Sequence, residues 1–324
     1  MPRSDRTQQA LERLTALRAS TDSTALAKEL TAYLGNRSNL VIAKAAKIAR
    51  EQGLSALVPE LVRAFEELMR DPARLDKRCA ALTEIASALY ELDCCEPEVY
   101  AQGMRHVQIE ASFGPPVDVA AALRGICAQG LVRTKYPQAL AEVVSLLVDS
   151  QAPARLGAAR ALASNGGDAG VLALRLKALV GDPDPEVIAE CFSGLLAADR
   201  EHSIEFVAGY IDASDGEISE AAILALGASR LPKAIDVLKD KWERTVRGPL
   251  RKTLLLALAT SRDEGALNFL VSLLNSASVE TASSIVTALA VHKNSERIRQ
   301  AVSAAVDRRR DRVLLDAFRR DFAE

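Results

Sequence analysis

The sequence predicts an all-α solenoid, a stack of about eight helix pairs closed by capping helices. Three observations predict this fold class: a motif recurs at regular spacing, each copy carries an apolar stripe of helical period, and the apolar content is mostly Ala and Leu. Hydrophobic residues make up 49% of the 324 residues but aromatic residues only 4%. Closely packed helices use small and unbranched side chains, whereas sandwiches and barrels favour aromatic and β-branched residues.

The repeat is clearest in the second half of the chain. Five similar segments begin at Pro153, Pro185, Gly216, Pro249 and Ser278. Their last strongly apolar residues, used as alignment anchors, are Leu162, Leu195, Leu226, Leu258 and Leu289. The anchors are separated by 33, 31, 32 and 31 residues, a period typical of stacked repeat units.

A second amphipathic segment precedes each of these motifs, for example ALAEVVSLLVD before the first and VLALRLKALVG before the second. Turn clusters such as DSQAP, GDPDP and DASDG separate the two segments, and their Pro, Gly and Asp residues end one helix and cap the next. In both segments apolar residues recur three to four apart, as on one face of a helix. Each unit is therefore predicted to be helix, short turn, helix.

The first half carries looser copies of the motif, anchored at Ile48, Ile85 and Ile126, with spacings of 36 to 41 residues. A pair of helices of this length cannot bury two apolar stripes alone, so the repeats must share one elongated core. We therefore expect one continuous domain over residues 1–324. It would comprise an N-terminal cap (1–20), irregular repeats (21–150), regular repeats (151–294) and a charged C-terminal cap (295–324).

The motif Arg155-Leu-Gly-Ala-Ala-Arg-Ala-Leu162 resembles the second helix of HEAT repeats. Arg78 and Arg251 hold the same position in their copies, while Ile188, Ser219 and Ala282 replace the arginine in others. Armadillo-like and phycobilin-lyase-type solenoids are similar at this level. The resemblance covers nearly the whole chain and implies that the aligned arginines bond the preceding turn, where Asp71, Asp76 and Asp149 stand. It also implies a concave surface, lined by second helices, at which such proteins bind.

Charge and composition narrow the classes of partner. The net charge is −2 and the pI about 6.1, whereas a chain dedicated to a polyanion usually has a clear basic excess. We see no apolar run suited to a secretory signal or a membrane span, and the five cysteines form no regular framework. We expect a cytoplasmic protein that does not engage membranes.

Candidate reactive groups are few, and we predict no catalytic, cofactor or metal site. The vicinal pair Cys94-Cys95 could serve redox or metal chemistry, but packing with one sulfur inward and one outward is favoured because no CxxC pairing or His cluster accompanies it. His106 and Glu110 are predicted to lie one turn apart on a helix, without the second histidine of a zinc motif. The C-terminal arginines are interpreted as the solvated face of the cap.

Polar positions on the second helices change sign along the chain, from basic near Lys44 to acidic in the middle and basic again afterwards. A duplex-binding groove should be basic throughout, so mixed charge favours a protein partner with complementary patches. The sequence thus predicts a non-catalytic scaffold that holds a protein or peptide segment. The predicted partner-binding residues are Glu186, Glu190, Glu217, Glu220, Arg247 and Lys252.

Two alternatives remain open. One is a nucleic-acid-binding protein similar to HEAT-like DNA glycosylases, although the only tryptophan, Trp242, is expected in the core of a first helix. The other is a chaperone or lyase for a tetrapyrrole, similar to the bilin lyases. Cys94, Cys95 and His106 would be its residues to test.

Overall fold

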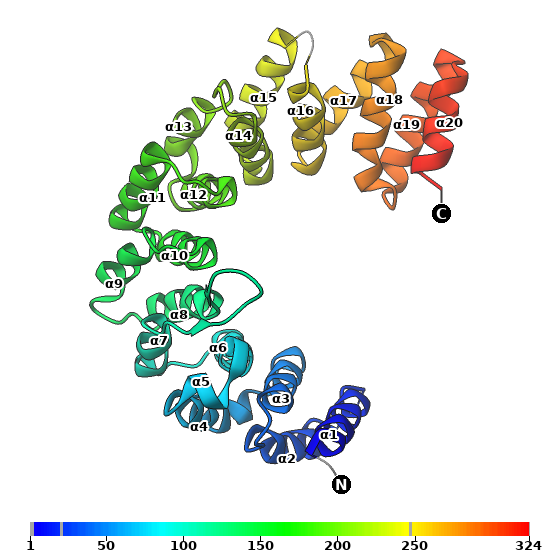
Figure 1. Ribbon diagram of the computed structural model, residues 1–324. Coiled ribbons are helices and arrows are strands. Elements are labelled where there is room, and N and C mark those ends of the chain that lie inside the picture. Colours follow the sequence, from blue (N-terminus) through cyan, green and yellow to red (C-terminus); the bar gives the residue numbers. More distant parts are fainter. Residues whose placement is uncertain (1–2, 20–21, 246–247, 324) are drawn as a thin grey trace. The chain divides into compact units, whose positions relative to one another are not determined.

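The computed structural model describes residues 3–19, 22–245 and 248–323, and within these ranges the chain is an all-α solenoid of helix pairs, as predicted (Figure 1). It forms two compact units, Met1–Ala173 (unit 1) and Leu174–Glu324 (unit 2). One continuous domain over residues 1–324 stays a prediction. No helix among the described residues combines the length and the apolarity that a membrane crossing requires.

Unit 1 contains four helix pairs preceded by one helix, α1 (Arg3–Leu17). The second helices pack on one another in chain order, and α1 packs on the first of them. The first helices are α2 (Ser23–Leu34), α4 (Val58–Met69), α7 (Pro97–Met104) and α9 (Ala139–Leu146). The second helices are α3 (Asn39–Glu51), α6 (Ala80–Glu91), α8 (Ala121–Arg133) and α10 (Ala152–Asn165).

Unit 2 repeats the arrangement more regularly, again with the second helices in chain order against one another. Its first helix, α11 (Asp168–Val180), crosses the boundary between the units. The other first helices are α13 (Ile204–Ala208), α15 (Pro232–Arg244), α17 (Glu264–Ser276) and α19 (Glu296–Arg309). The second helices are α12 (Pro185–Ala198), α14 (Gly216–Ser229), α16 (Leu250–Thr260), α18 (Val279–Leu289) and α20 (Arg312–Asp321).

The anchor positions lie in the core, with one exception. All five leucine anchors of the regular repeats, together with Ile48 and Ile85, are at most 1% exposed. Ile126 is half-buried, whereas Leu131 on the same helix is fully buried. Because Leu131 stands 31 residues before Leu162, the regular period extends one repeat further back than the sequence alignment on Ile126 indicated.

Small residues let the second helices of unit 1 approach closely. A Cβ added to Gly157 on α10 would lie 2.1 Å from the Cα of Gly125 on α8. A Cβ on Gly125 would in turn meet the carbonyl oxygen of Pro153 at 2.6 Å. Only glycine fits at both positions, because real Cβ atoms do not approach other heavy atoms so closely.

The longer connections of unit 1 form structure of their own. Residues 70–79 contain a one-turn helix, α5 (Pro72–Leu75), and a 3-10 turn, η2 (Lys77–Cys79). Residues 105–120 form a loop with a two-stranded antiparallel ribbon of β1 (Ile109–Glu110) and β2 (Val117–Asp118). The predicted helix through His106 and Glu110 is therefore wrong: α7 ends at Met104, and Glu110 belongs to β1.

Candidate interaction surface

Two of the predicted glutamates occupy equivalent places on neighbouring second helices of unit 2. Glu186 on α12 and Glu217 on α14 each stand nine residues before the buried leucine anchor of their helix, and both are exposed. Asp184 and Asp215 cap these helices by accepting hydrogen bonds from the backbone N–H groups of Glu186 and Glu217. The first-turn position places the glutamates at the positive end of the helix dipole, which stabilises them there.

Glu220 and Lys252 are a second equivalent pair, each six residues before its anchor on α14 and α16. Both side chains are exposed. Glu190 on α12 is half-buried and already interacts within the protein. Arg247 lies outside the described residues.

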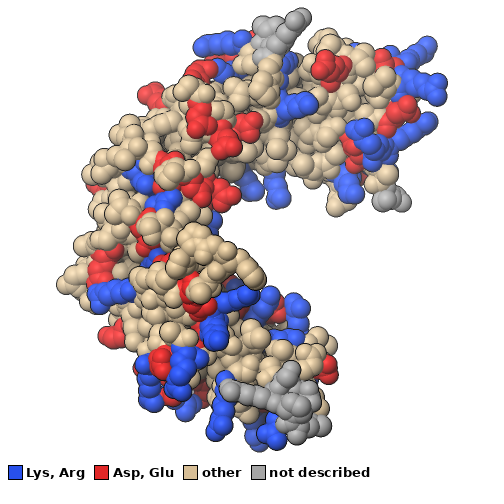
Figure 2. All heavy atoms as spheres, viewed as in Figure 1, with Lys and Arg blue, Asp and Glu red and all other residues tan. Residues whose placement is uncertain are grey.

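The same alignment identifies residues that the sequence argument missed. Glu280 on α18 stands in the position of Glu186 and Glu217, and it is exposed. Two residues before the anchors, Leu224 on α14 is 38% exposed and Leu256 on α16 is 40% exposed. Acidic side chains gather over α12 and α14 (Figure 2). The exposed residues of α12, α14 and α16 that this alignment brings together form what we call the α12–α16 face: Glu186, Glu217, Glu220, Leu224, Lys252 and Leu256.

The aligned arginines serve the architecture at two of three positions. Arg155 Nη1 donates to the carbonyl oxygen of Asp149 at 2.8 Å, and Arg251 donates to the carbonyl oxygen of Thr245. The Arg251 guanidinium also stacks on the buried Trp242, 3.6 Å from the ring centroid, so the tryptophan is a core residue as predicted. Arg78 differs: it is exposed and precedes α6 rather than lying within it.

Arg124 on α8 is the arginine that the alignment missed, because Ile126 was taken as the anchor of its repeat. It stands seven residues before Leu131, the spacing of Arg155 to Leu162. Its guanidinium, 3% exposed, lies 2.7 Å from Asp118 and 2.9 Å from Asp149. Burial lowers the pKa of Arg124, but the Asp149 and Asp118 carboxylates outweigh burial and raise it.

Basic side chains on the second helices of unit 1 are largely engaged within the chain. Lys44 donates to the carbonyl oxygen of Leu11, and Arg50 forms ion pairs with Glu84 at 3.6 Å and Glu91 at 3.1 Å. On α16 of unit 2, Arg251 is likewise committed to Trp242. A continuous basic track for a phosphate backbone is therefore not built from these residues.

The tetrapyrrole candidates do not come together. Cys94 and Cys95 precede α7, whereas His106 follows it, so about 12 Å of helix separates them. Cys94 is buried and Cys95 is exposed, as predicted for a pair with one sulfur inward, and burial raises the pKa of Cys94. Within the described ranges no group of three or more His, Cys, Asp or Glu side chains is placed to hold a metal ion.

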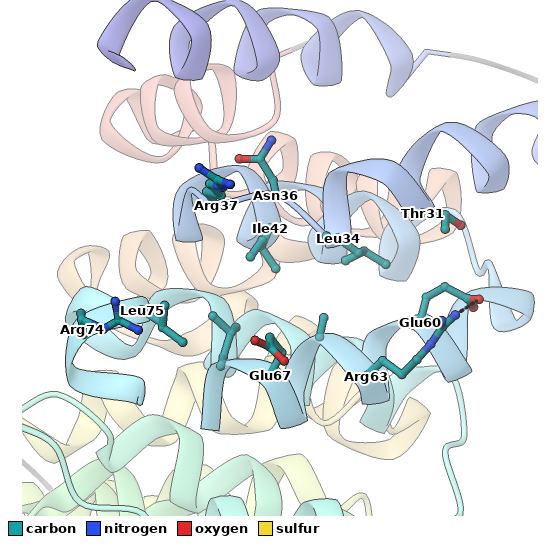
Figure 3. A pocket seen from close by; sticks show the side chains of 13 residues that line it. Thr31, Leu34, Asn36, Arg37, Ile42, Glu60, Arg63, Glu67, Arg74 and Leu75 are labelled. Carbon is teal, nitrogen blue, oxygen red and sulfur yellow. Dashed lines mark hydrogen bonds and ion pairs between the residues drawn. The ribbon is translucent and has the colours of Figure 1, made fainter. Parts of the chain in front are cut away.

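One pocket of about 620 Å³ lies in unit 1 between α2 and α3 on one side and α4 and α5 on the other (Figure 3). Leu34 and Ile42 contribute apolar surface to it. The rim charges are mostly compensated: Arg63 pairs with Glu60, and Arg74 pairs with Asp71, each at 2.6 Å. A second pocket, of about 500 Å³, includes His106, Arg105 and Tyr136. Neither pocket gathers a nucleophile, a base and an orienting acid.

Comparison with known proteins identifies the repeats. A family model for HEAT repeats matches residues 172–259, which run from α11 to α16 and include all six predicted partner-binding residues. No curated protein matches the chain. HEAT repeats are commonly protein-interaction scaffolds. This match and the successive helix pairs identify residues 172–259 as HEAT repeats, and the rest of the described chain is similar to them in its helix pairing.

Proposed function

We propose that the protein is a non-catalytic adaptor that holds a protein segment on the α12–α16 face. The observation that carries the proposal is the set of three exposed carboxylates, Glu186, Glu217 and Glu220, on two second helices that pack directly together. The exposed Leu224 lies on α14, one turn from Glu220, and the exposed Leu256 lies on α16, one turn from Lys252. The partner segment would be basic with apolar residues between its charges.

The mixture of charge and apolar surface supports a protein ligand over a nucleic acid. Nucleic-acid affinity depends on cations that neutralise phosphates, and carboxylates oppose it. Lys252 is the only basic residue among the described members of the predicted site, which also contains four glutamates. Complementary charge between proteins sets partner choice and association rate, and the leucines would add buried apolar area.

Helix stability alone accounts for only part of this face. A glutamate in the first turn stabilises a helix by about 0.3–1 kcal/mol through the helix dipole. Glu186 and Glu217 have that position, but Glu220 on α14 and the exposed leucines gain nothing from it. A binding role accounts for all of them.

The test is an affinity purification from the native host with a triple charge reversal, Glu186→Lys, Glu217→Lys and Glu220→Lys. Any partner recovered with the unmodified chain is then purified, and its affinity for each variant is measured. We expect the reversal to weaken binding about tenfold or more, with a steep dependence on salt. The matched control reverses Glu205, Asp240 and Glu243, which are exposed on first helices of the same unit, and should leave binding unchanged.

Three outcomes would overturn the proposal: no protein partner, a partner whose binding the reversal leaves unchanged, or equal losses in both variants. DNA and RNA duplexes are assayed in parallel at low salt. Binding of a duplex that weakens with salt and depends on Lys252 would favour the nucleic-acid alternative instead. Circular dichroism melting of both triple variants separates loss of folding from loss of contact.

A further inference from the structure

The β1–β2 ribbon of unit 1 carries exposed apolar side chains that no packing within the described chain explains. The loop 105–120 projects past α8 on the side away from α7 and α9 (Figure 1). Four large apolar residues of this loop are exposed to solvent: Val107, Ile109, Phe113 and Val117.

Buried charges fix one side of the base of this loop. Arg124 joins Asp118, at the end of β2, to Asp149, in the turn before α10, and its Nη1 donates to the carbonyl oxygen of His106 at 3.0 Å. Burial raises the pKa of Asp118, but the N–H groups of Ala120 and Gln108 and the Arg124 guanidinium lower it below its ordinary value. Burying charges costs free energy that apolar residues would avoid, so the network is a costly way to stabilise a turn.

Gln108 and Asp76 fix the other side. The buried Gln108 donates from Nε2 to the carbonyl oxygen of Asp76 at 2.9 Å and to Glu110 at 2.7 Å. The Asp76 carboxylate accepts from Asn39 Nδ2 and from two N–H groups at the start of α6. The ribbon is thereby tied to α3, α6 and α8 together.

The tip is also held in one conformation. Ser112 Oγ accepts from the N–H of Gly114 at 3.1 Å and donates to the carbonyl oxygen of Pro115 at 2.8 Å. Pro115 and Pro116 restrict their own φ angles. Phe113 is thus presented at full exposure from a turn with little conformational freedom left, and a pre-organised side chain loses little entropy on binding.

Two exposed cations lie beside the ribbon. The N–H of Arg78 donates to Glu110 on β1 at 2.8 Å, and the carbonyl oxygen of Lys77 accepts from Asn39 at 2.9 Å. Arg78 and Cys79 have φ of 63° and 52°, a left-handed conformation that non-glycine residues rarely adopt and that concentrates at functional segments. Asp76 is buried, Glu110 is half-buried and Asp118 is paired with Arg124, so among these charged residues only Lys77 and Arg78 are exposed to solvent.

We propose that the ribbon and these two cations form a docking surface for an extended protein segment that carries a carboxylate next to an aliphatic or aromatic residue. Phe113, Val107 and Ile109 would bury the apolar residue, and Lys77 or Arg78 would pair with the carboxylate. Single-stranded nucleic acid fits less well, because one aromatic ring and two cations beside Glu110 offer little stacking or phosphate neutralisation. This surface uses residues of unit 1 only and does not depend on the α12–α16 face.

The experiment selects displayed random peptides of about twelve residues on the full-length protein and measures the affinity of the enriched peptides. We expect a group of peptides with Asp or Glu beside Leu, Ile or Phe. Phe113→Ala and Lys77→Glu should each weaken their binding, Phe113→Ala by about thirtyfold as for a central aromatic contact. Hydrogen exchange of the complex should show added protection within residues 105–119.

Two matched variants control for general effects. Val148→Ala and Lys135→Glu change an exposed apolar residue and an exposed cation elsewhere in unit 1, and should leave these peptides bound. The triple reversal of Glu186, Glu217 and Glu220 should also leave them bound, so failure of this proposal and of the adaptor proposal are distinguishable. The docking surface is overturned if no peptide is enriched, or if enriched peptides bind Phe113→Ala and Lys77→Glu as well as the unmodified chain. It is also overturned if single-stranded oligonucleotides, and not peptides, bind in a manner that depends on Phe113.

Discussion

Unit 1 and unit 2 use the same helix pair but stabilise it differently. In unit 2 the anchors follow at 31 or 32 residues, aspartates cap several helices, and leucines fill the core between them. In unit 1 the longer connections need support, and a buried arginine with two carboxylates supplies it at the base of the ribbon. Both units have an apolar core, but the ribbon of unit 1 is held in addition by a few buried polar groups at its base.

The largest expected effect comes from removing the centre of that network. Arg124→Ala would leave the Asp118 and Asp149 carboxylates with little compensation, which costs about 3–5 kcal/mol for a buried pair. Arg251→Ala is the matched change in unit 2 and should cost about 1 kcal/mol, since that guanidinium is half-buried and stacks on Trp242. Hydrogen exchange by mass spectrometry of the full-length protein reports the two units separately. Equal losses in both variants would contradict the contrast between the units.

A smaller effect is expected where α8 and α10 touch. Gly157→Ala forces these helices apart, because the new Cβ would meet the backbone of Gly125, and such overpacking costs about 1–3 kcal/mol. Gly216→Ala at the start of α14 is the control, since a Cβ there meets nothing within 4 Å. Chemical denaturation should separate the two variants. A Gly157→Ala protein as stable as Gly216→Ala would show that the close approach of α8 and α10 is not required.

The smallest effect should appear as a response to pH. The pKa of Asp118 is lowered in the folded chain, so the stability it contributes is present above the unfolded pKa of about 3.9 and is lost as the pH falls through the lowered value. Proteolysis within residues 105–119 should therefore be slow and constant from neutral pH to about pH 4, then accelerate below it. Asp118→Asn should be cleaved faster at neutral pH and should lack this acid-dependent step. An identical acid response in both proteins would exclude Asp118 as its cause.

The sequence was informative where the repeat is regular. The five leucine anchors are buried as their spacing predicted, because helical periodicity and turn residues are local signals that one segment carries by itself. The arginine position was also correct for Arg155 and Arg251. It was wrong for Arg78, and Arg124 was missed. The long connections of unit 1 change the spacing between repeats, so an alignment based on one anchor residue in each repeat selected Ile126 instead of Leu131.

The candidate surfaces were only partly visible in the sequence. Glu186, Glu217 and Glu220 could be assigned to second helices, but their exposure beside Leu224 and Leu256 depends on how those helices pack. The ribbon could not be found, because residues 106–110 also satisfy a helical pattern. What excludes the helix is the burial of Gln108 against Asp76, more than thirty residues earlier in the chain.

By itself the sequence determined the helix pairs, their period, the core leucines and the absence of a basic excess. These follow from composition and from spacing over a few turns of helix. The tertiary structure decided which charges are engaged and which are exposed: Arg124 is buried between two carboxylates, Arg251 is stacked on Trp242, and Lys77 and Arg78 remain exposed next to β1. The physical reason is that the partner of a charge comes from a neighbouring helix or loop distant in sequence, and no local pattern specifies it.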